Sequence, residues 1–265
     1  MADERAVGVF DSGVGGISTL AEMTRLMPRE RFLFYGDTAH APYGTKPREE
    51  VLGYVRAVME HLLRQNVKAV AIACNTATAV AAAELRATYD LPIIGIEPAL
   101  KPAHELRHGG SILVLATPMT LRLEKFQHLM AQYGDGAVPL PCPGLMELVE
   151  REAFDQAERY LREHFSAYDM NRVDAVVLGC THYVFLRPVL SRILPEGVRV
   201  LDGNLGTARQ LRRVLEGRGL LRETGEGSVI FETSGAPETV LPRMEALMRR
   251  ARAIIDNRPE TNLTK

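Results

Sequence analysis

Residues 69–74 read AVAIAC and residues 175–180 read AVVLGC, so two short apolar runs each end in a cysteine. Continuous runs of Val, Ile, Leu and Ala are typical of strands that are buried on both faces of a parallel sheet. Asn-Thr follows the first cysteine and Thr-His follows the second. The two runs therefore predict two equivalent buried strands, each with a thiol and polar neighbours at its carboxyl end.

The similarity extends to other parts of the chain. Residues 7–10 (VGVF) and 112–115 (ILVL) are separated by nearly the same number of positions as the two cysteines. The loop at residues 37–45 corresponds roughly, at a similar separation, to residues 140–145. Three matched features at one separation predict two similar α/β units.

Strand-sized apolar runs alternate along the chain with longer segments whose apolar residues recur at helical spacing. This alternation predicts an α/β fold with doubly wound parallel sheets. Helices are expected at 17–27, 47–66, 77–89 and 144–165, and another near Phe185. Strands are expected at Ala6–Asp11, Arg31–Gly36, Ala69–Cys74, Ile93–Glu97, Ser111–Ala116, Ala137–Pro141, Ala175–Gly179, Arg199–Asp202 and Ser228–Thr233. Residues 256–265 have no hydrophobic pattern, and we expect them to be frayed.

The composition excludes several classes of function. The 265 residues include 32 Lys plus Arg and 33 Asp plus Glu, and the formal net charge is −1. No basic excess is present to neutralise a phosphate backbone, so nucleic-acid binding is not expected. No apolar run reaches the roughly 18 residues that span a bilayer. The charged start MADER is unlike a signal peptide, so we expect a cytoplasmic protein that does not associate with membranes.

The three cysteines, Cys74, Cys142 and Cys180, are an odd number without a disulfide-framework spacing. In a cytoplasmic protein they are expected to be free thiols. The chain has no CxxC pair, so no structural zinc site is expected.

The positions of Cys74 and Cys180 indicate a reaction. Ligands of open parallel sheets bind at the carboxyl ends of strands. Two units related by pseudo-two-fold symmetry, with those ends facing, bring both thiols to one cleft. Inverting a stereocentre requires one group to remove a proton from one face and a second group to return a proton on the other. A helix start after each cysteine is expected to favour the thiolate. The pair therefore predicts an amino-acid racemase that needs no cofactor.

Asp11 and Ser12 begin the stretch DSGVGG at residues 11–16, between a predicted strand and a predicted helix. The glycines allow a tight turn whose backbone N–H groups suit an anion, and Asp11 can orient a substrate ammonium or tune a thiol. Alternatively, Asp11 is an N-terminal cap of the helix. The stretch does not satisfy GxGxxG, because Ser18 stands where the third glycine is needed, so a dinucleotide is not expected.

The other candidates are hydrogen-bonding residues near the ends of predicted strands. His182 can titrate near neutrality and help Cys180 to exchange its proton, although a lone histidine is more often structural. Taken alone, the loop at residues 42–45 is an ordinary turn, and Glu150 is an exposed helical residue. The candidates for contacts to a substrate, including its carboxylates, are Tyr43, Gly44, Asn75, Thr76, Thr117, Thr120, Thr181 and His182.

Five motifs together resemble those of the glutamate racemase family. They are FDSGVGG (10–16), YGDTAHAPYGTK (35–46), ACNTAT (73–78), GIEPA (95–99) and LGCTHY (178–183). The resemblance runs in order from residue 7 to at least 204. It implies conversion of L-glutamate to D-glutamate for peptidoglycan, and hence for the cell wall, without pyridoxal phosphate or metal. It also implies two domains, residues 1–97 with 208–265 and residues 98–207, and a homodimer.

The same resemblance implies roles for individual residues. Cys74 and Cys180 match the two proton donors and acceptors, and Asp11, His182 and Glu150 match groups that assist the thiols. The substrate-binding positions of the family match Asp11, Ser12, Tyr43, Gly44, Asn75, Thr76, Thr181 and His182.

Three alternatives remain open. The first is a racemase of aspartate or another acidic amino acid, because the length of the substrate side chain cannot be deduced from these motifs. The second is a phosphatase or mutase with Asp11 as nucleophile, but Gly13 stands where a second aspartate would be required. The third is a non-catalytic ligand-binding or inhibitory protein with this fold, which the paired cysteines disfavour.

Overall fold

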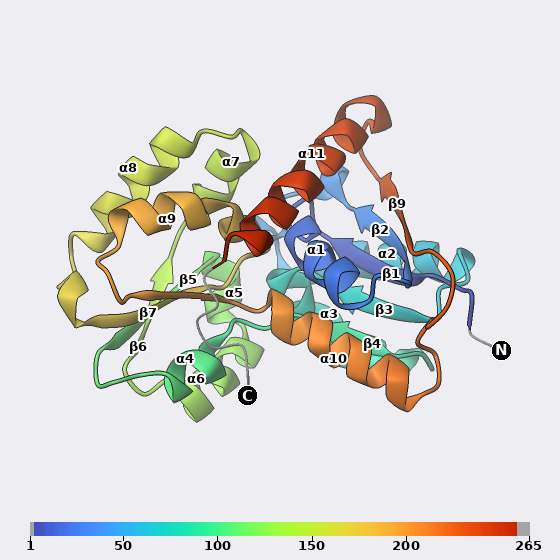
Figure 1. The fold of residues 1–265 in the computed structure, drawn as a ribbon, viewed down its shortest axis with the longest axis horizontal. Coiled ribbons are helices and arrows are strands. Elements are labelled where there is room, and N and C mark those ends of the chain that lie inside the picture. The colour runs from blue at the N-terminus through green and yellow to red at the C-terminus, as the bar shows by residue number, and fades with distance from the viewer. Residues whose placement is uncertain (1–2, 259–265) are drawn as a thin grey trace.

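The computed structural model describes residues 3–258, which form two lobes, each built on a parallel β-sheet (Figure 1). The first sheet has the strand order β4-β3-β1-β2-β9, and the second has the order β6-β5-β7-β8. The strands are β1 (Val7–Asp11), β2 (Arg31–Gly36), β3 (Ala69–Ile72), β4 (Ile93–Gly95), β5 (Ser111–Ala116), β6 (Ala137–Pro141), β7 (Val173–Leu178), β8 (Arg199–Asp202) and β9 (Ser228–Thr233). The predicted α/β fold with parallel sheets is confirmed, and every strand end lies within two residues of the prediction.

Helices connect and cover the strands. The α-helices are α1 (Ile17–Leu26), α2 (Arg48–Arg64), α3 (Asn75–Thr88), α4 (Leu100–Glu105), α5 (Pro118–Arg122), α6 (Glu124–Tyr133), α7 (Leu145–Glu150), α8 (Phe154–Phe165), α9 (Arg187–Ile193), α10 (Asn204–Gly217) and α11 (Pro237–Asp256). The 3₁₀ helices are η1 (Thr38–His40), η2 (Tyr43–Thr45), η3 (Met170–Arg172) and η4 (Thr181–Leu186).

The strand order repeats between the sheets. The order β4-β3-β1-β2 in the first sheet has the same connectivity as β8-β7-β5-β6 in the second. The strand before Cys74 and the strand before Cys180 therefore occupy equivalent positions, each beside the first strand of its unit. The sequence repeat predicted from the cysteine runs corresponds to this repeated topology, to which the first sheet adds β9.

Alternate residues of the central strands pack on opposite faces of each sheet. In β5, Leu113 and Leu115 share a core with α7, α8 and α9, whereas Ile112 and Val114 pack with α4 and α6. β1 lies in the same way between α1, α10 and α11 on one face and α2 and α3 on the other. Because side chains alternate along a strand, burial of both faces requires an uninterrupted apolar run. This explains why the strands could be recognised in the sequence.

The prediction of one helix over residues 144–165 was wrong, because the structure divides this segment into α7 and α8. Glu152 has a φ of 55°, in the left-handed region, and ends the first helix. The backbone N–H of Ala153 donates to the carbonyl of Leu148 at 2.9 Å, as in a Schellman motif. The apolar spacing continues across the break since both helices cover the same core. The break leaves Glu150 as the last residue of α7.

The chain crosses between the sheets after β4 and again after β8. A Cβ atom on Gly203 would lie 2.1 Å from the carbonyl oxygen of Glu97, so the two crossings are in direct contact. The predicted boundary between residues 97 and 98 falls in the first crossing. The predicted boundary between residues 207 and 208 falls inside α10, which packs against α1 of the first lobe. The second boundary therefore interrupts a helix, and a division before Asn204 does not.

The C-terminal helix α11 lies across the first lobe and reaches towards the second (Figure 1). It extends to Asp256, and residues 259–265 of the stretch expected to be frayed lie outside the described residues. Within residues 3–258, none of the helices has the length and apolar character required to cross a bilayer.

Candidate active site

The carboxyl ends of strands from both sheets meet between the lobes. Asp11 ends β1, and its Oδ2 accepts a hydrogen bond of 3.2 Å from Thr181 Oγ1, which follows β7. Ser18 Oγ donates to the main-chain carbonyl of Thr181 at 3.1 Å. Cys74 and Cys180 follow β3 and β7 at the same ends. The predicted meeting of the two strand ends is therefore present in the structure.

Cys74 is the N-cap residue of α3, the helix predicted to follow it. The backbone N–H of Ala77 donates to its Sγ at 3.4 Å, and a contact of 3.5 Å joins Sγ to Ser12 Oγ. Burial, followed by the negative charges of Asp11 and Cys180, raises the pKa of Cys74 to about 12. These effects outweigh the helix end, so the expectation that its position favours the thiolate was wrong for Cys74. Asp11, whose charge acts on Cys74, also accepts the hydrogen bond from Thr181, the residue after Cys180.

Cys180 has a different local environment. It precedes the 3₁₀ helix η4 and its side chain makes no capping hydrogen bond. The helix expected near Phe185 is α9, which begins at Arg187. Its Sγ instead lies 3.8 Å from Nδ1 of His182, whose Nε2 lies 3.0 Å from Oε1 of Glu150. The predicted assistants of the second thiol thus form a linear relay, Glu150–His182–Cys180.

The charges in this relay support one another. Burial disfavours a charged imidazole, but hydrogen bonds to Cys180 and Glu150 and nearby negative charges outweigh it, and they raise the pKa of His182 to about 10. Burial likewise opposes ionisation of Glu150, but the hydrogen bond and charge of His182 and the charge of Arg243 lower its pKa. An imidazolium held by a carboxylate can exchange a proton with the adjacent sulfur.

The turn at residues 11–16 packs against this relay. A Cβ atom on Gly15 would lie 2.3 Å from Nδ1 of His182, and one on Gly13 would lie 3.1 Å from Oε1 of Glu150. A side chain at residue 15 would therefore displace the imidazole, whereas one at residue 13 would only crowd the carboxylate. Asp11 accepts a 2.8 Å hydrogen bond from Gly13 N, and its carboxyl does not cap α1, whose N-cap is Gly16. Burial, despite several hydrogen bonds, raises the pKa of Asp11.

Three threonine hydroxyls form a cluster across the two lobes. Thr76 Oγ1 lies 3.1 Å from Thr120 Oγ1 and 3.3 Å from Thr117 Oγ1, and the last two are 2.9 Å apart. A Cβ atom on Gly44 would lie 3.0 Å from Cβ of Thr117, so the loop before α2 also contacts this cluster. Hydroxyl groups that can rotate to donate suit a carboxylate.

Asn75 is 6% exposed, and its side-chain Oδ1 has no hydrogen-bond partner within the described residues. Such orphaned acceptors are rare in protein interiors, because an unmade hydrogen bond is costly. Beside Cys74, this acceptor suits a donor carried by a ligand, such as an ammonium group.

Tyr43 is buried, and its hydroxyl is hydrogen-bonded within the protein. It donates to Asp37 Oδ2 at 2.5 Å, and Asp37 Oδ1 lies 2.8 Å from Nδ1 of His40. Burial and the charge of Asp37 raise the pKa of Tyr43, which keeps it a neutral donor. Sequence reasoning missed Asp37, although it directly follows β2 just as Asp11 ends β1.

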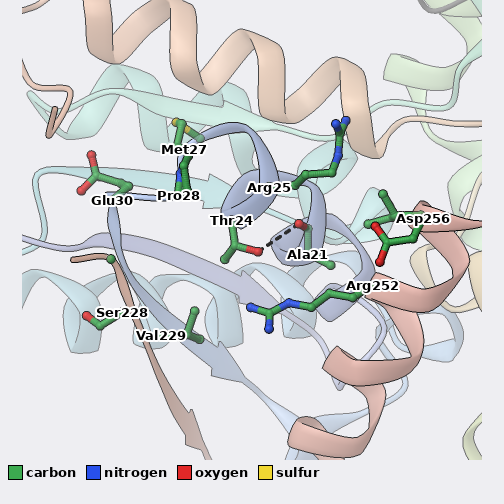
Figure 2. A pocket seen from close by; sticks show the side chains of 12 residues that line it. Ala21, Thr24, Arg25, Met27, Pro28, Glu30, Ser228, Val229, Arg252 and Asp256 are labelled. Carbon is green, nitrogen blue, oxygen red and sulfur yellow. Dashed lines mark hydrogen bonds between the residues drawn. The ribbon is translucent and has the colours of Figure 1, made fainter. Parts of the chain in front are cut away.

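Cavity volume does not locate this site. A cavity of about 440 Å³ lies between the end of α1, the start of β9 and the end of α11, with Arg25, Thr24 and Arg252 among its lining residues (Figure 2). A larger groove of about 2160 Å³ runs between α4, α9, α10 and β8. Neither is lined by Cys74 or Cys180, which are 6% and 9% exposed. Within residues 3–258 no three His, Cys, Asp or Glu side chains are grouped to hold a metal ion.

Comparison with known proteins agrees with the chemistry of the paired thiols. Residues 12–211 match the family model described as Asp/Glu/Hydantoin racemase. The chain belongs to this racemase family. It is 48% identical over 225 residues to a glutamate racemase of Clostridium botulinum (strain Kyoto / Type A2), which covers 83% of this chain and 88% of that one. It is 46% identical over 258 residues to a glutamate racemase of Bifidobacterium adolescentis, which covers 94% of this chain and 100% of that one.

The fold of this family member is also similar to a solved structure. The crystal structure of glutamate racemase from Thermus thermophilus in complex with beta-chloro-D-alanine matches with a TM-score of 0.81. The two sequences are 36% identical, and the match covers 94% of each chain. Membership of the Asp/Glu/hydantoin racemase family thus rests on sequence and on fold together.

Proposed function

We propose that this protein is a glutamate racemase, in which Cys74 and Cys180 move a proton on and off the α-carbon of glutamate. The observation that carries the proposal is the position of these thiols at the ends of equivalent strands in two sheets whose carboxyl ends meet. Curated relatives that are 46% and 48% identical are glutamate racemases, which supports glutamate as the substrate.

The proposed reaction is symmetric. One thiolate takes the α-proton and becomes a thiol, while the C–H electron pair stays on the carbon and its adjoining carboxylate. The other thiol gives its proton to the opposite face of that carbon and becomes a thiolate. The roles of Cys74 and Cys180 are exchanged in the reverse direction. The two thiols are buried, so the substrate is enclosed in a site from which water is excluded. Hydrogen-bond donors in such a site stabilise the carbanion-like transition state strongly.

The surroundings of Cys74 suggest how substrate activates it. Its pKa of about 12 reflects burial and neighbouring negative charge. A substrate ammonium between Asp11, Asn75 and the sulfur would compensate that charge and favour the thiolate. The orphaned Oδ1 of Asn75 accepts from this ammonium in our proposal.

We assign the side-chain carboxylate of glutamate to the hydroxyls of Thr76, Thr117 and Thr120. They lie within 3.3 Å of one another and join the two lobes. Ser12 and Thr181 then remain for the α-carboxylate, and Gly44 shapes the pocket beside Thr117. His182 and Glu150 exchange protons with Cys180 between turnovers.

The proposal includes the biological setting predicted from the sequence. The reaction as written uses protein groups only, and its product, D-glutamate, is a component of peptidoglycan. Three free, buried cysteines are in keeping with a cytoplasmic location. We further propose two domains, residues 1–97 with 204–265 and residues 98–203, and a homodimer.

The first test uses purified protein freed of metal and pyridoxal phosphate. The protein is incubated in D₂O with L-glutamate, D-glutamate or L-aspartate, and optical rotation and α-deuterium are followed. Loss of rotation from both glutamate enantiomers, with deuterium at the α-carbon, supports the proposal. Selective action on aspartate would keep the mechanism and change the substrate. No exchange with any of them would refute the proposal and favour a binding protein.

The role of the thiols is tested separately. Cys74→Ser and Cys180→Ser should each abolish racemisation, since a hydroxyl is a far weaker acid than a thiol. Cys142→Ser is the matched control, because Cys142 is equally a buried free thiol but follows β6 and takes no part in the proposed reaction. Near-wild-type racemisation by either of the first two variants would exclude the two-thiol mechanism.

A further inference from the structure

The relay that serves Cys180 ends on a helix terminus. Glu150 is the last residue of α7, and the last carbonyl groups of a helix have no partner within it. The turn after α7 satisfies the carbonyls of Leu148 and Val149 through the N–H groups of Ala153 and Glu152. The carbonyl of Glu150 itself accepts a hydrogen bond from the guanidinium of Arg243. A cation at a helix C-terminus also interacts favourably with the helix dipole.

Arg243 comes from a distant part of the chain. It lies near the start of α11, which follows β9 of the first sheet, whereas Glu150 belongs to the second lobe. The next residue, Met244, is fully buried, and its Cε would lie 2.5 Å from a Cβ on Gly36 of β2. α11 also packs against α1 and η4. Arg243 is therefore held firmly by the first lobe while it contacts the second.

We infer that Arg243 is a positioning residue of the active site, which fixes Glu150 and through it the His182 imidazole beside Cys180. This inference rests on the proposed racemase function. Outside the relay itself, the charged groups that act on it are Arg243 on α11, which faces Glu150, and Asp11 at the end of β1, which faces His182. The hydrogen bond of Arg243 holds the end of α7, and its positive charge favours the ionised carboxylate of Glu150.

The effect is confined to one of the two thiols. Cys74 lies beside Ser12 and the start of α3, whereas the hydrogen bond of Arg243 goes to the end of α7. Loss of Arg243 should therefore change the behaviour of Cys180 and leave that of Cys74 unchanged. A contact that only stabilised the fold would not distinguish between the two sulfurs.

The kinetic test compares four variants. Arg243→Gln and Arg243→Met remove the charge, and the second keeps a long apolar stem if the first folds poorly. Arg243→Lys retains the charge, and Arg249→Gln changes an exposed arginine on the same helix as the control. We expect the uncharged variants to lose about tenfold in kcat with KM changed less than about twofold, because the substrate contacts are intact. The acid limb of the pH profile of kcat should move to higher pH in these variants, because the charge that lowers the pKa of Glu150 is lost. In Arg243→Lys the acid limb should lie where it does in wild type.

A second measurement does not depend on racemisation. Wild type and variants are treated with iodoacetamide from about pH 5 to 9, and alkylation of each cysteine is followed by peptide mass spectrometry. In the uncharged variants Cys180 should react about threefold more slowly than in wild type near pH 6–7, because its imidazolium neighbour is no longer held. Arg249→Gln is the reference, and its Cys180 should react as in wild type. Cys74, whose pKa is about 12, should stay largely unreacted in all variants.

The outcomes separate the inference from the proposed function. A wild-type protein that does not racemise glutamate refutes the function, whereas the rate of Cys180 alkylation still reports whether Arg243 controls Cys180. An unchanged rate of Cys180 alkylation in both uncharged variants would overturn the inference. Equal slowing of Cys180 in Arg249→Gln would also overturn it, because it indicates a general effect of changing an arginine of α11.

Discussion

Gly15→Ala is the sharpest test of how the first lobe shapes the active site. The added Cβ would lie 2.3 Å from Nδ1 of His182, 2.6 Å from Cε1 and 2.7 Å from Cγ, so it meets the ring itself. An ordinary contact begins near 3.4 Å, so the ring or the turn must move by about 1 Å. His182 is 4% exposed and has little room to move. A displacement of about 1 Å from reactive geometry can lower a rate about 100-fold.

We therefore expect Gly15→Ala to lose about 100-fold in kcat for glutamate and about 1–3 kcal/mol of unfolding free energy. Racemisation is measured by circular dichroism, and stability by urea unfolding. Gly53→Ala is the control, since Gly53 lies inside α2 with no atom within 4 Å of the added Cβ. That change should raise stability by about 0.5–1 kcal/mol and leave kcat unchanged. Wild-type kcat and stability in Gly15→Ala would refute the steric argument.

Two further predictions follow from the site. Thr117→Val keeps the shape of the side chain but removes a hydroxyl from the threonine cluster, so KM for glutamate should rise by about tenfold or more, with a smaller change in kcat. Steady-state kinetics with L- and D-glutamate measures both constants. An unchanged KM would show that the hydroxyl of Thr117 does not bind the substrate. The pKa of His182 is raised from 6.5 to about 10. Protonation of His182 therefore stabilises the folded state, by an amount of order a few kcal/mol. This contribution is complete below about pH 6.5 and disappears as the pH rises through about 10. Urea unfolding of wild type and His182→Asn at several pH values should show the stability difference shrinking over this range, and a constant difference would contradict the raised pKa.

The strands follow from features that are local in sequence, whereas their order in each sheet comes from the structure. The buried runs before Cys74 and Cys180 are continuous because helices cover both faces of each sheet. The break after Glu150 was missed because apolar spacing reports which face is buried, and α7 and α8 bury the same face. A non-glycine residue with positive φ, such as Glu152, carries no clear sequence signal.

The residues of the candidate site, like the elements of the fold, could be predicted only in part from the sequence. Residues at strand ends, such as Asp11 and Thr181, could be selected because parallel strands bring their carboxyl ends to one edge. Asp37 had the same signal and was overlooked. Arg243 had no such signal, since its contact with Glu150 depends on where a distant helix packs.

The sequence by itself determined the parallel α/β units, their repeat and the residues at the strand ends, because hydrophobic periodicity and short motifs are local properties of the chain. Only the tertiary structure decided the electrostatics of the two thiols. Both cysteines follow similar strands, yet Cys74 caps a helix and has a pKa raised by burial, whereas Cys180 lies beside His182, which contacts Glu150. Desolvation and long-range contacts set these differences, and they depend on which surfaces the folded chain brings together.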